Sequence, residues 1–261
     1  MVDAISLRDV SFGYSPHAKK VLNSIQVDIP ARKVTAILGP NGTGKTTLLH
    51  LMLGLLKPDQ GQITIKGRQR SKYSRQESAQ IMGLVPQFES IPFNFTVFEY
   101  VLLGRAPYLK PFQVPGSADV RICEQALSML GIWALREKQV TALSGGERRL
   151  VHIARMLSQQ PSILLLDEPT AHLDLENQSK ILTLLRKLSG EGITVIITTH
   201  DPNAAIFAAD HFVLMKGGQV VKEGLQESVM TTQHLKALYN APVRVERTNG
   251  QTVVVMDREA E

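Results

Sequence analysis

Short apolar runs bounded by turn residues alternate along the chain with longer stretches of helical periodicity. Apolar and polar residues alternate around Ile5 and Leu7 and again over residues 25–29, which predicts two early, half-exposed strands. Continuous apolar runs predict buried strands at residues 34–38, 163–166 and 193–198. Strands that alternate with helices in this way favour an α/β fold with a mixed or parallel sheet.

Helical periodicity dominates residues 95–158, but four residues interrupt it and predict a loop over residues 105–118: Pro107, Pro111, Pro115 and Gly116. We therefore expect a helical subdomain, residues 87–158, inserted into an α/β core made of residues 1–86 and 159–240. The tail, residues 241–261, alternates around Asn249-Gly250, which predicts a β-hairpin.

The composition is that of an ordinary globular protein, with 43% hydrophobic and 20% charged residues, and it excludes disordered and collagen-like chains. The longest nearly continuous apolar stretch, residues 48–56, is far too short to cross a bilayer. No basic start precedes a hydrophobic block, so we expect no secretory signal. The single cysteine, Cys123, can form no disulfide within the chain, which fits a reducing cytosol.

The net charge of +5 raises the question of a nucleic-acid or anionic membrane partner. The basic residues are scattered, however. Their one local excess, which only Asp59 opposes, consists of Lys57, Lys66, Arg68, Arg70, Lys72 and Arg75. Such a cluster is typically a solvated face, so we expect no nucleic-acid partner.

Candidate chemistry begins directly after the predicted strand 34–38. Eight residues match the pattern G-x-x-x-x-G-K-[ST], with a strand before and a helix after them: Gly39, Pro40, Asn41, Gly42, Thr43, Gly44, Lys45 and Thr46. Glycines allow backbone amides to surround phosphate oxygens, and the helix adds its positive end. Lys45 would reach the β- and γ-phosphates, and the Thr46 hydroxyl would bind Mg²⁺. The strand–loop–helix context disfavours the alternative, a glycine-rich turn without a ligand.

A second candidate site follows the apolar strand 163–166, which ends in Asp167 and Glu168. Carboxylates at the end of a buried strand lie at the edge of the sheet, where ligands of α/β proteins bind. Asp167 suits Mg²⁺ coordination, and Glu168 suits the role of general base toward an attacking water. Taken alone, such a pair could simply begin a turn.

A third candidate is the segment Leu143-Ser144-Gly145-Gly146-Glu147. Ser144 and Glu147 form a capping-box pattern before an amphipathic run. Gly145 and Gly146 leave the first amides of that helix uncovered, which favours a second anion site. A plain helix cap is the alternative, but two glycines in a first turn weaken a helix.

Together these motifs resemble the ATP-binding subunit of ATP-binding-cassette (ABC) transporters over residues 3–240. Gly39 to Thr47 resembles Walker A, Asp167-Glu168 resembles Walker B, and LSGGE resembles the family signature. Four more positions match the family in the expected order. Tyr14 resembles the aromatic residue that stacks on adenine, and Gln87 resembles the Q-loop glutamine that senses γ-phosphate, metal and water. Asp174 resembles the D-loop aspartate, and His200 resembles the switch histidine that contacts the γ-phosphate.

The resemblance implies a P-loop NTPase (RecA-like) core with an antiparallel β-subdomain and an inserted α-helical subdomain. It implies Mg²⁺-dependent ATP hydrolysis in a head-to-tail dimer. Each ATP would lie between the phosphate loop and Thr47 of one subunit and the signature and D-loop of the other subunit. The residues of that second subunit would be Ser144, Gly145, Gly146, Glu147 and Asp174. It also implies transmembrane permease subunits, an indirect substrate-binding protein, and a place at the cytoplasmic face of the membrane.

Residues 96–108 resemble the start of the helical subdomain in importers of iron–siderophores, haem and cobalamin, and residues 170–176 and the hairpin fit that branch. The chain departs from the common signature, since Glu147 replaces a glutamine and Arg148-Arg149-Leu150 follows. Zinc, manganese, molybdate and tungstate importers share parts of the pattern. An exporter and a non-transport ABC ATPase acting on nucleic acid or ribosomes remain alternatives.

Overall fold

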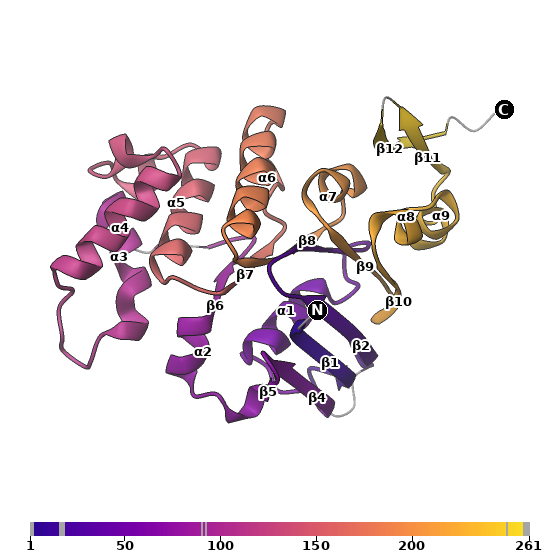
Figure 1. The fold of residues 1–261 in the computed structure, drawn as a ribbon, viewed down its shortest axis with the longest axis horizontal. Coiled ribbons are helices and arrows are strands. Elements are labelled where there is room, and N and C mark those ends of the chain that lie inside the picture. Colours follow the sequence, from indigo (N-terminus) through magenta and orange to yellow (C-terminus); the bar gives the residue numbers. More distant parts are fainter. Residues whose placement is uncertain (1–2, 16–18, 90, 92, 249, 258–261) are drawn as a thin grey trace. The chain divides into compact units, whose positions relative to one another are not determined.

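A computed structural model describes residues 3–15, 19–89, 91, 93–248 and 250–257. The chain forms two compact units (Figure 1). The first comprises residues 1–72 and 185–261, and the second comprises residues 73–184. Helix α6 (Leu175–Gly190) runs from the second unit into the first.

An antiparallel sheet in the first unit is formed by the early strands. In spatial order they are β2 (Leu22–Pro30), β1 (Asp3–Phe12), β4 (Gln60–Ile65) and β5 (Arg68–Gln69). Along β2, Ile25, Val27 and Ile29 are buried while their neighbours are more exposed. The alternating pattern of the sequence therefore forms the expected strand with one face toward the core.

The first unit also contains a mainly parallel set of strands in the order β10 (Gln219–Gly224), β9 (His211–Lys216), β3 (Val34–Leu38) and β8 (Thr194–Thr199). Strand β3 is parallel to both β8 and β9, whereas β10 is antiparallel to β9. Every residue of β3 and β8 is buried, as continuous apolar runs predict. Helix α1 (Lys45–Leu53) follows β3 after a short loop.

The remaining elements of the first unit are short and mostly lie near its C-terminal end (Figure 1). They are η1 (Arg70–Lys72), α7 (Pro202–Ala208), α8 (Gln226–Val229), α9 (Thr232–Tyr239), β11 (Val243–Thr248) and β12 (Gln251–Met256). Strands β11 and β12 pair from Val243↔Met256 to Thr248↔Gln251, which confirms the predicted hairpin. Of the two expected turn residues, Asn249 lies outside the described residues.

The second unit is mostly helical, with the parallel pair β6 (Met82–Val85) and β7 (Ile163–Asp167). Its helices, apart from the start of α6, are α2 (Arg75–Ile81), α3 (Val97–Leu102), η2 (Leu103–Tyr108), α4 (Ser117–Met129), η3 (Trp133–Leu135), η4 (Val140–Ala142) and α5 (Gly145–Ser158). Buried side chains of α3, α4 and α5, including Val101, Cys123 and Val151, form one hydrophobic cluster.

The prediction of a loop over residues 105–118 is wrong at its start, because residues 103–108 form the 3₁₀ helix η2. Buried contacts hold this segment in place. A Cβ atom on Gly104 would lie 2.1 Å from the carbonyl oxygen of Arg155, and Arg105 forms a 2.8 Å ion pair with Asp119. The prolines therefore mark an irregular stretch that begins only after Tyr108.

Among the residues that the structure describes, no helix combines the length and the apolar character needed to span a membrane.

Candidate functional site

The predicted phosphate-binding loop connects β3 to α1 within the first unit. Gly42 and Gly44 have φ angles of 77° and 94°, a region that residues with side chains rarely adopt. At Gly39, a Cβ atom would lie 2.3 Å from the carbonyl oxygen of Met215. The loop therefore needs glycine at Gly42 and Gly44 to turn the backbone and at Gly39 to allow close packing.

The side chain of Lys45, at the start of α1, folds back into this loop. Its Nζ atom donates to the carbonyl oxygens of Gly39 at 2.7 Å and Pro40 at 3.2 Å, and only 6% of the residue is exposed. The Thr43 hydroxyl also donates to the Pro40 carbonyl, at 2.9 Å. A buried ammonium beside the first amides of a helix creates positive potential, which suits a phosphate-bearing ligand. Thr46 lies one residue further along α1, exposed.

Tyr14, the predicted adenine platform, is anchored at two points. Its hydroxyl lies 3.1 Å from the hydroxyl of Thr47, and its ring meets Phe12 edge-to-face at 5.0 Å between centroids. Nevertheless, 64% of Tyr14 is exposed. A fixed aromatic ring with an open surface is what stacking on a base requires.

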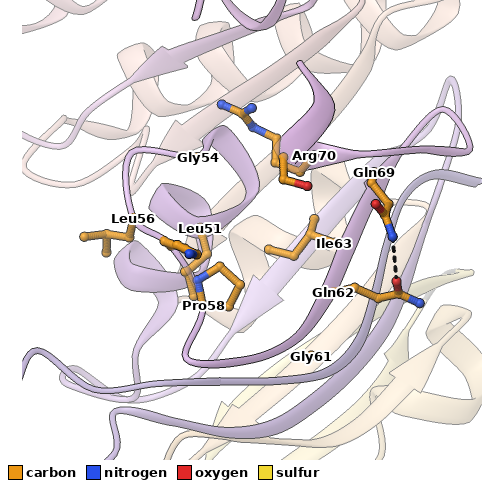
Figure 2. A pocket seen from close by; sticks show the side chains of 11 residues that line it. Leu51, Gly54, Leu56, Pro58, Gly61, Gln62, Ile63, Gln69 and Arg70 are labelled. Atoms are coloured by element: carbon orange, nitrogen blue, oxygen red, sulfur yellow. Dashed lines mark hydrogen bonds between the residues drawn. The ribbon is translucent and has the colours of Figure 1, made fainter. Parts of the chain in front are cut away.

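The other end of α1 lies beside a cavity of about 500 Å³ (Figure 2). Arg70 lines this cavity and donates from Nε to the Leu53 carbonyl at 2.9 Å, so a cation caps the negative end of the helix. Gly54 has a φ of 75°, and a Cβ atom there would collide with the Arg70 guanidinium. Arg70 is thus a structural part of the basic cluster that the sequence suggested was a solvated face.

His200 is placed beside the phosphate loop by strand pairing. Leu38 and Thr199 are partners in the parallel strands β3 and β8, so Gly39 and His200 leave the same edge from neighbouring strands. The next residue, Asp201, caps α7 by accepting from the amide of Asn203 at 2.8 Å. His200 is exposed at this edge.

Asp167 and Glu168 lie at the end of β7 in the second unit, only 5% and 7% exposed. Glu168 has a φ of 47°, the left-handed region that is uncommon for a residue with a side chain. Arg149 of α5 donates to the backbone carbonyls of both acids, at 3.1 Å to Asp167 and 2.6 Å to Glu168. Burial lowers the pKa of Arg149, and the two carboxylates oppose that shift.

Gln87 follows β6 and lines a cavity of about 220 Å³, to which Arg149 and His172 also contribute. Asp174, two residues after His172, is exposed. Its carboxylate accepts from the amide of Asn177 at 2.8 Å and from the Asn177 side chain at 3.0 Å. In this chain Asp174 therefore also stabilises the first turn of α6.

The capping box expected at the signature segment is present. The Ser144 hydroxyl accepts from the Glu147 amide at 3.3 Å, and the Glu147 carboxylate accepts from the Ser144 amide at 2.9 Å. This second bond holds the pKa of Glu147 below its ordinary value. The two glycines differ, because a Cβ atom on Gly146 would lie 2.6 Å from Asn177 whereas one on Gly145 would meet nothing within 4 Å. Packing explains Gly146, but no contact among the described residues explains Gly145.

The predicted residues thus fall into two groups, one in each unit. Tyr14, residues 39–47 and His200 belong to the first unit, and Gln87, residues 144–147, Asp167, Glu168 and Asp174 belong to the second.

Sequence reasoning missed two sets of residues in the second unit. The sequence identified Arg149 only as a departure from the common signature. A basic residue at a buried position of a helix, however, indicates a side chain that binds buried acceptors. The other set is centred on Glu89, whose carboxylate lies 2.8 Å from Nδ1 of His152 and 2.8 Å from the guanidinium of Arg155. No pattern in the sequence connects these three residues.

A family model described as "ABC transporter" matches residues 22–171. The chain belongs to the ABC transporter family. A Helicobacter pylori protein named "Probable iron chelatin transport ATP-binding protein" is 34% identical over 241 residues, which cover 92% of this chain and 94% of that protein. The "Molybdate import ATP-binding protein MolC" of Haemophilus influenzae is 36% identical over 244 residues, covering 93% and 90%. A solved inward-facing ABC transporter assigned to the metal-chelate type matches with a TM-score of 0.86 and 33% identity over 98% of both chains.

The membership confirms the expected fold class and makes the chain an ATP-binding subunit that hydrolyses ATP. ATP-binding subunits of importers in this family dimerise and pair with permeases, so the chain is part of a membrane-associated transporter.

Proposed function

We propose that this ABC subunit powers the import of a chelated metal or a metal cofactor, of the iron–siderophore, haem or cobalamin type, through a separate permease. The observation that carries the proposal is similarity over nearly the whole chain to a metal-chelate transporter and to an iron chelatin ATP-binding protein. Gly104 and Arg105, within the segment that resembles this branch, are tightly packed in the helical subdomain proposed for residues 87–158.

The nucleotide would bind first to the phosphate loop. Lys45 would leave the carbonyls of Gly39 and Pro40 to reach the β- and γ-phosphates, while amides of residues 39–47 surround the phosphate oxygens. Tyr14 would stack on adenine with its exposed face. Among the described residues no group of three His, Cys, Asp or Glu side chains could hold a metal. Mg²⁺ usually keeps several waters and takes few protein ligands. Thr46, Gln87 and Asp167 would hold it, and it would neutralise phosphate charge.

Hydrolysis would depend on positioning and electrostatics rather than on a covalent intermediate. Glu168 would accept a proton from the attacking water, Gln87 would orient that water, and His200 would contact the γ-phosphate. Arg149 donates to the backbone carbonyl of Glu168, whose φ of 47° is uncommon for a residue with a side chain. This bond restrains the backbone from which the proposed general base projects.

A complete site would need a second copy of the chain, arranged head to tail. Ser144, Gly145, Gly146 and Glu147 of that copy would close over the γ-phosphate, with Asp174 beside them. Ser144 and Gly145, at the start of α5, are exposed, which supports this role because the amides at the start of a helix favour an anion. A substrate-binding protein would act on the permease rather than on this chain, which would lie at the cytoplasmic face of the membrane.

Molybdate import is the second candidate, because a molybdate import protein is 36% identical to the chain. The test is affinity purification of the tagged chain from its native membranes in mild detergent, followed by mass spectrometry. A polytopic permease is expected, and vesicles containing the complex should take up a labelled iron chelate, haem or cobalamin with ATP. Uptake of molybdate alone would select the second candidate. Ribosomal proteins or DNA without a membrane partner would refute the transport function. The Lys45→Ala chain should retain the permease but not the uptake.

A further inference from the structure

The C-terminal segment of the chain contacts the loop that carries His200. The hydroxyl of Tyr239, the last residue of α9, donates to the backbone carbonyl of His200 at 3.0 Å. The two residues are 39 positions apart in sequence, and both belong to the first unit. Tyr239 lies beyond every motif that identifies the family in this chain.

Helix α9 is well fixed, so it can hold Tyr239 in a defined place. Leu235 and Leu238 of this helix are buried. At its end, Asn240 adopts a φ of 50° and its side chain accepts from Lys216 Nζ at 2.7 Å. Lys216 is the last residue of β9, a strand adjacent to β3. The position of the Tyr239 hydroxyl is thereby tied to the sheet from which the phosphate loop emerges.

The C-terminal hairpin contacts α7, the helix that begins two residues after His200. The side-chain amide of Asn203, in α7, donates to the carbonyl of Val254 at 3.0 Å and accepts from the Val254 amide at 2.8 Å. Within the turn, the Asp201 amide donates to the Thr199 hydroxyl at 3.0 Å. Bonds to the C-terminal segment, residues 226–257, therefore restrain the His200 carbonyl and Asn203, three residues further along the chain (Figure 1).

We propose that Tyr239 is a positioning residue for His200, and that the C-terminal segment sets the orientation of the switch histidine before ATP arrives. A bond to the His200 carbonyl restrains the peptide plane that follows it, and so restrains the backbone from which the side chain projects. The proposal rests on the proposed function, in which His200 contacts the γ-phosphate. Losing the restraint would slow the chemical step more than it would weaken nucleotide binding.

Tyr239→Phe removes the hydroxyl and keeps the ring. We expect kcat for ATP hydrolysis to fall about five- to tenfold, with KM changed less than twofold and an unchanged melting temperature. Tyr108→Phe is the matched control, since the Tyr108 hydroxyl likewise donates to a backbone carbonyl, that of Gln159 at 2.9 Å, in the other unit. This control should keep the wild-type kcat. Equal kcat values for the two variants would overturn the proposal.

A double-mutant cycle separates this proposal from the proposed function. If Tyr239 acts through His200, Tyr239→Phe should slow hydrolysis no further in a His200→Ala background, whereas an equal fold loss in both backgrounds would refute the positioning role. Wild-type hydrolysis by His200→Ala itself would instead refute the function proposed for His200, and the positioning proposal with it. Amide hydrogen exchange over residues 199–205 gives a second measurement: it should be faster in Tyr239→Phe than in Tyr108→Phe, and equal rates would count against the proposal.

Discussion

The guanidinium of Arg149 donates a 2.6 Å hydrogen bond to the backbone carbonyl of Glu168. It also donates to the carbonyls of Asp167, Pro169 and Pro86, at distances between 2.7 and 3.1 Å. One buried side chain of α5 therefore connects the acids at the end of β7 with the segment that carries Gln87.

Arg149→Ala should destabilise the second unit strongly, because it leaves several buried carbonyls without this donor. Unsatisfied buried groups cost about 1–3 kcal/mol each, so for the carbonyls of Asp167, Glu168 and Pro169 we expect a loss of at least about 3 kcal/mol in the free energy of unfolding. Urea denaturation measures it. The control is Arg148→Ala, since Arg148 is exposed and its guanidinium donates to the Leu143 carbonyl at 3.1 Å. If the two variants lost similar free energies of unfolding, the buried hydrogen bonds of Arg149 would not be the cause of the loss.

Glu168→Gln should leave ATP binding intact and slow hydrolysis by about 10²–10⁴-fold, the usual contribution of a general base. The substitution keeps the size of the side chain, and the backbone bond from Arg149 does not depend on the carboxylate. Single-turnover hydrolysis and calorimetric ATP binding measure the two effects. Glu176→Gln, which removes an exposed carboxylate paired with Lys180, is the control and should keep the wild-type rate. A near wild-type rate for Glu168→Gln would exclude the general-base role.

The phosphate loop and the buried strands were predictable because local rules determine them. Gly42 and Gly44 are required by backbone conformation, and continuous apolar runs form β3 and β8. The same holds for the Ser144–Glu147 capping box, whose two members are three residues apart.

Contacts between distant residues could not be predicted in this way. Arg149 meets Pro86 across 63 positions and Tyr239 meets His200 across 39, and no spacing rule relates such pairs. The 3₁₀ helix at residues 103–108 was missed for the same reason, because the packing of Gly104 against Arg155 outweighs the local effect of Pro107.

Ser144→Arg should abolish ATP-dependent dimerisation, because a large cation would occupy the surface proposed to close over the γ-phosphate. The chain offers a matched control in Ser74→Arg, since Ser74 caps α2 through an equivalent box with Glu77. Each variant loses one helix cap, which costs about 1 kcal/mol. Light scattering with ATP, in the Glu168→Gln background, should detect a dimer for Ser74→Arg and a monomer for Ser144→Arg. A normal dimer in both would argue against the trans site.

The Glu89 cluster should make stability depend on acid pH. Burial raises the pKa of Glu89, but the hydrogen bond to His152 and the charge of Arg155 outweigh it and hold the pKa below its ordinary value of 4.5. The ionised carboxylate therefore stabilises the fold above about pH 4.5, and this contribution is lost as the pH falls through the lowered pKa. Glu89→Gln should be less stable than wild type at pH 6, by about 1–2 kcal/mol, and the difference should shrink toward pH 3. A difference that stays constant across this range would contradict the assignment.

Gly145→Ala separates folding from function at the signature segment. Gly145 is helical, exposed and free of steric contact for a Cβ atom, so alanine should stabilise α5 by up to about 1 kcal/mol. If the first turn of α5 closes over ATP bound to a second copy, the added methyl group would instead crowd the nucleotide and lower kcat at least tenfold. Thermal unfolding and steady-state hydrolysis measure the two effects on the same sample. Gly146→Ala serves as the comparison, since its Cβ atom would meet Asn177 at 2.6 Å and destabilise the monomer itself. If Gly145→Ala is more stable than the wild type yet inactive, its defect arises in the ATP-bound dimer and not in the folding of the single chain. Full activity of Gly145→Ala would exclude Gly145 from the ATP site.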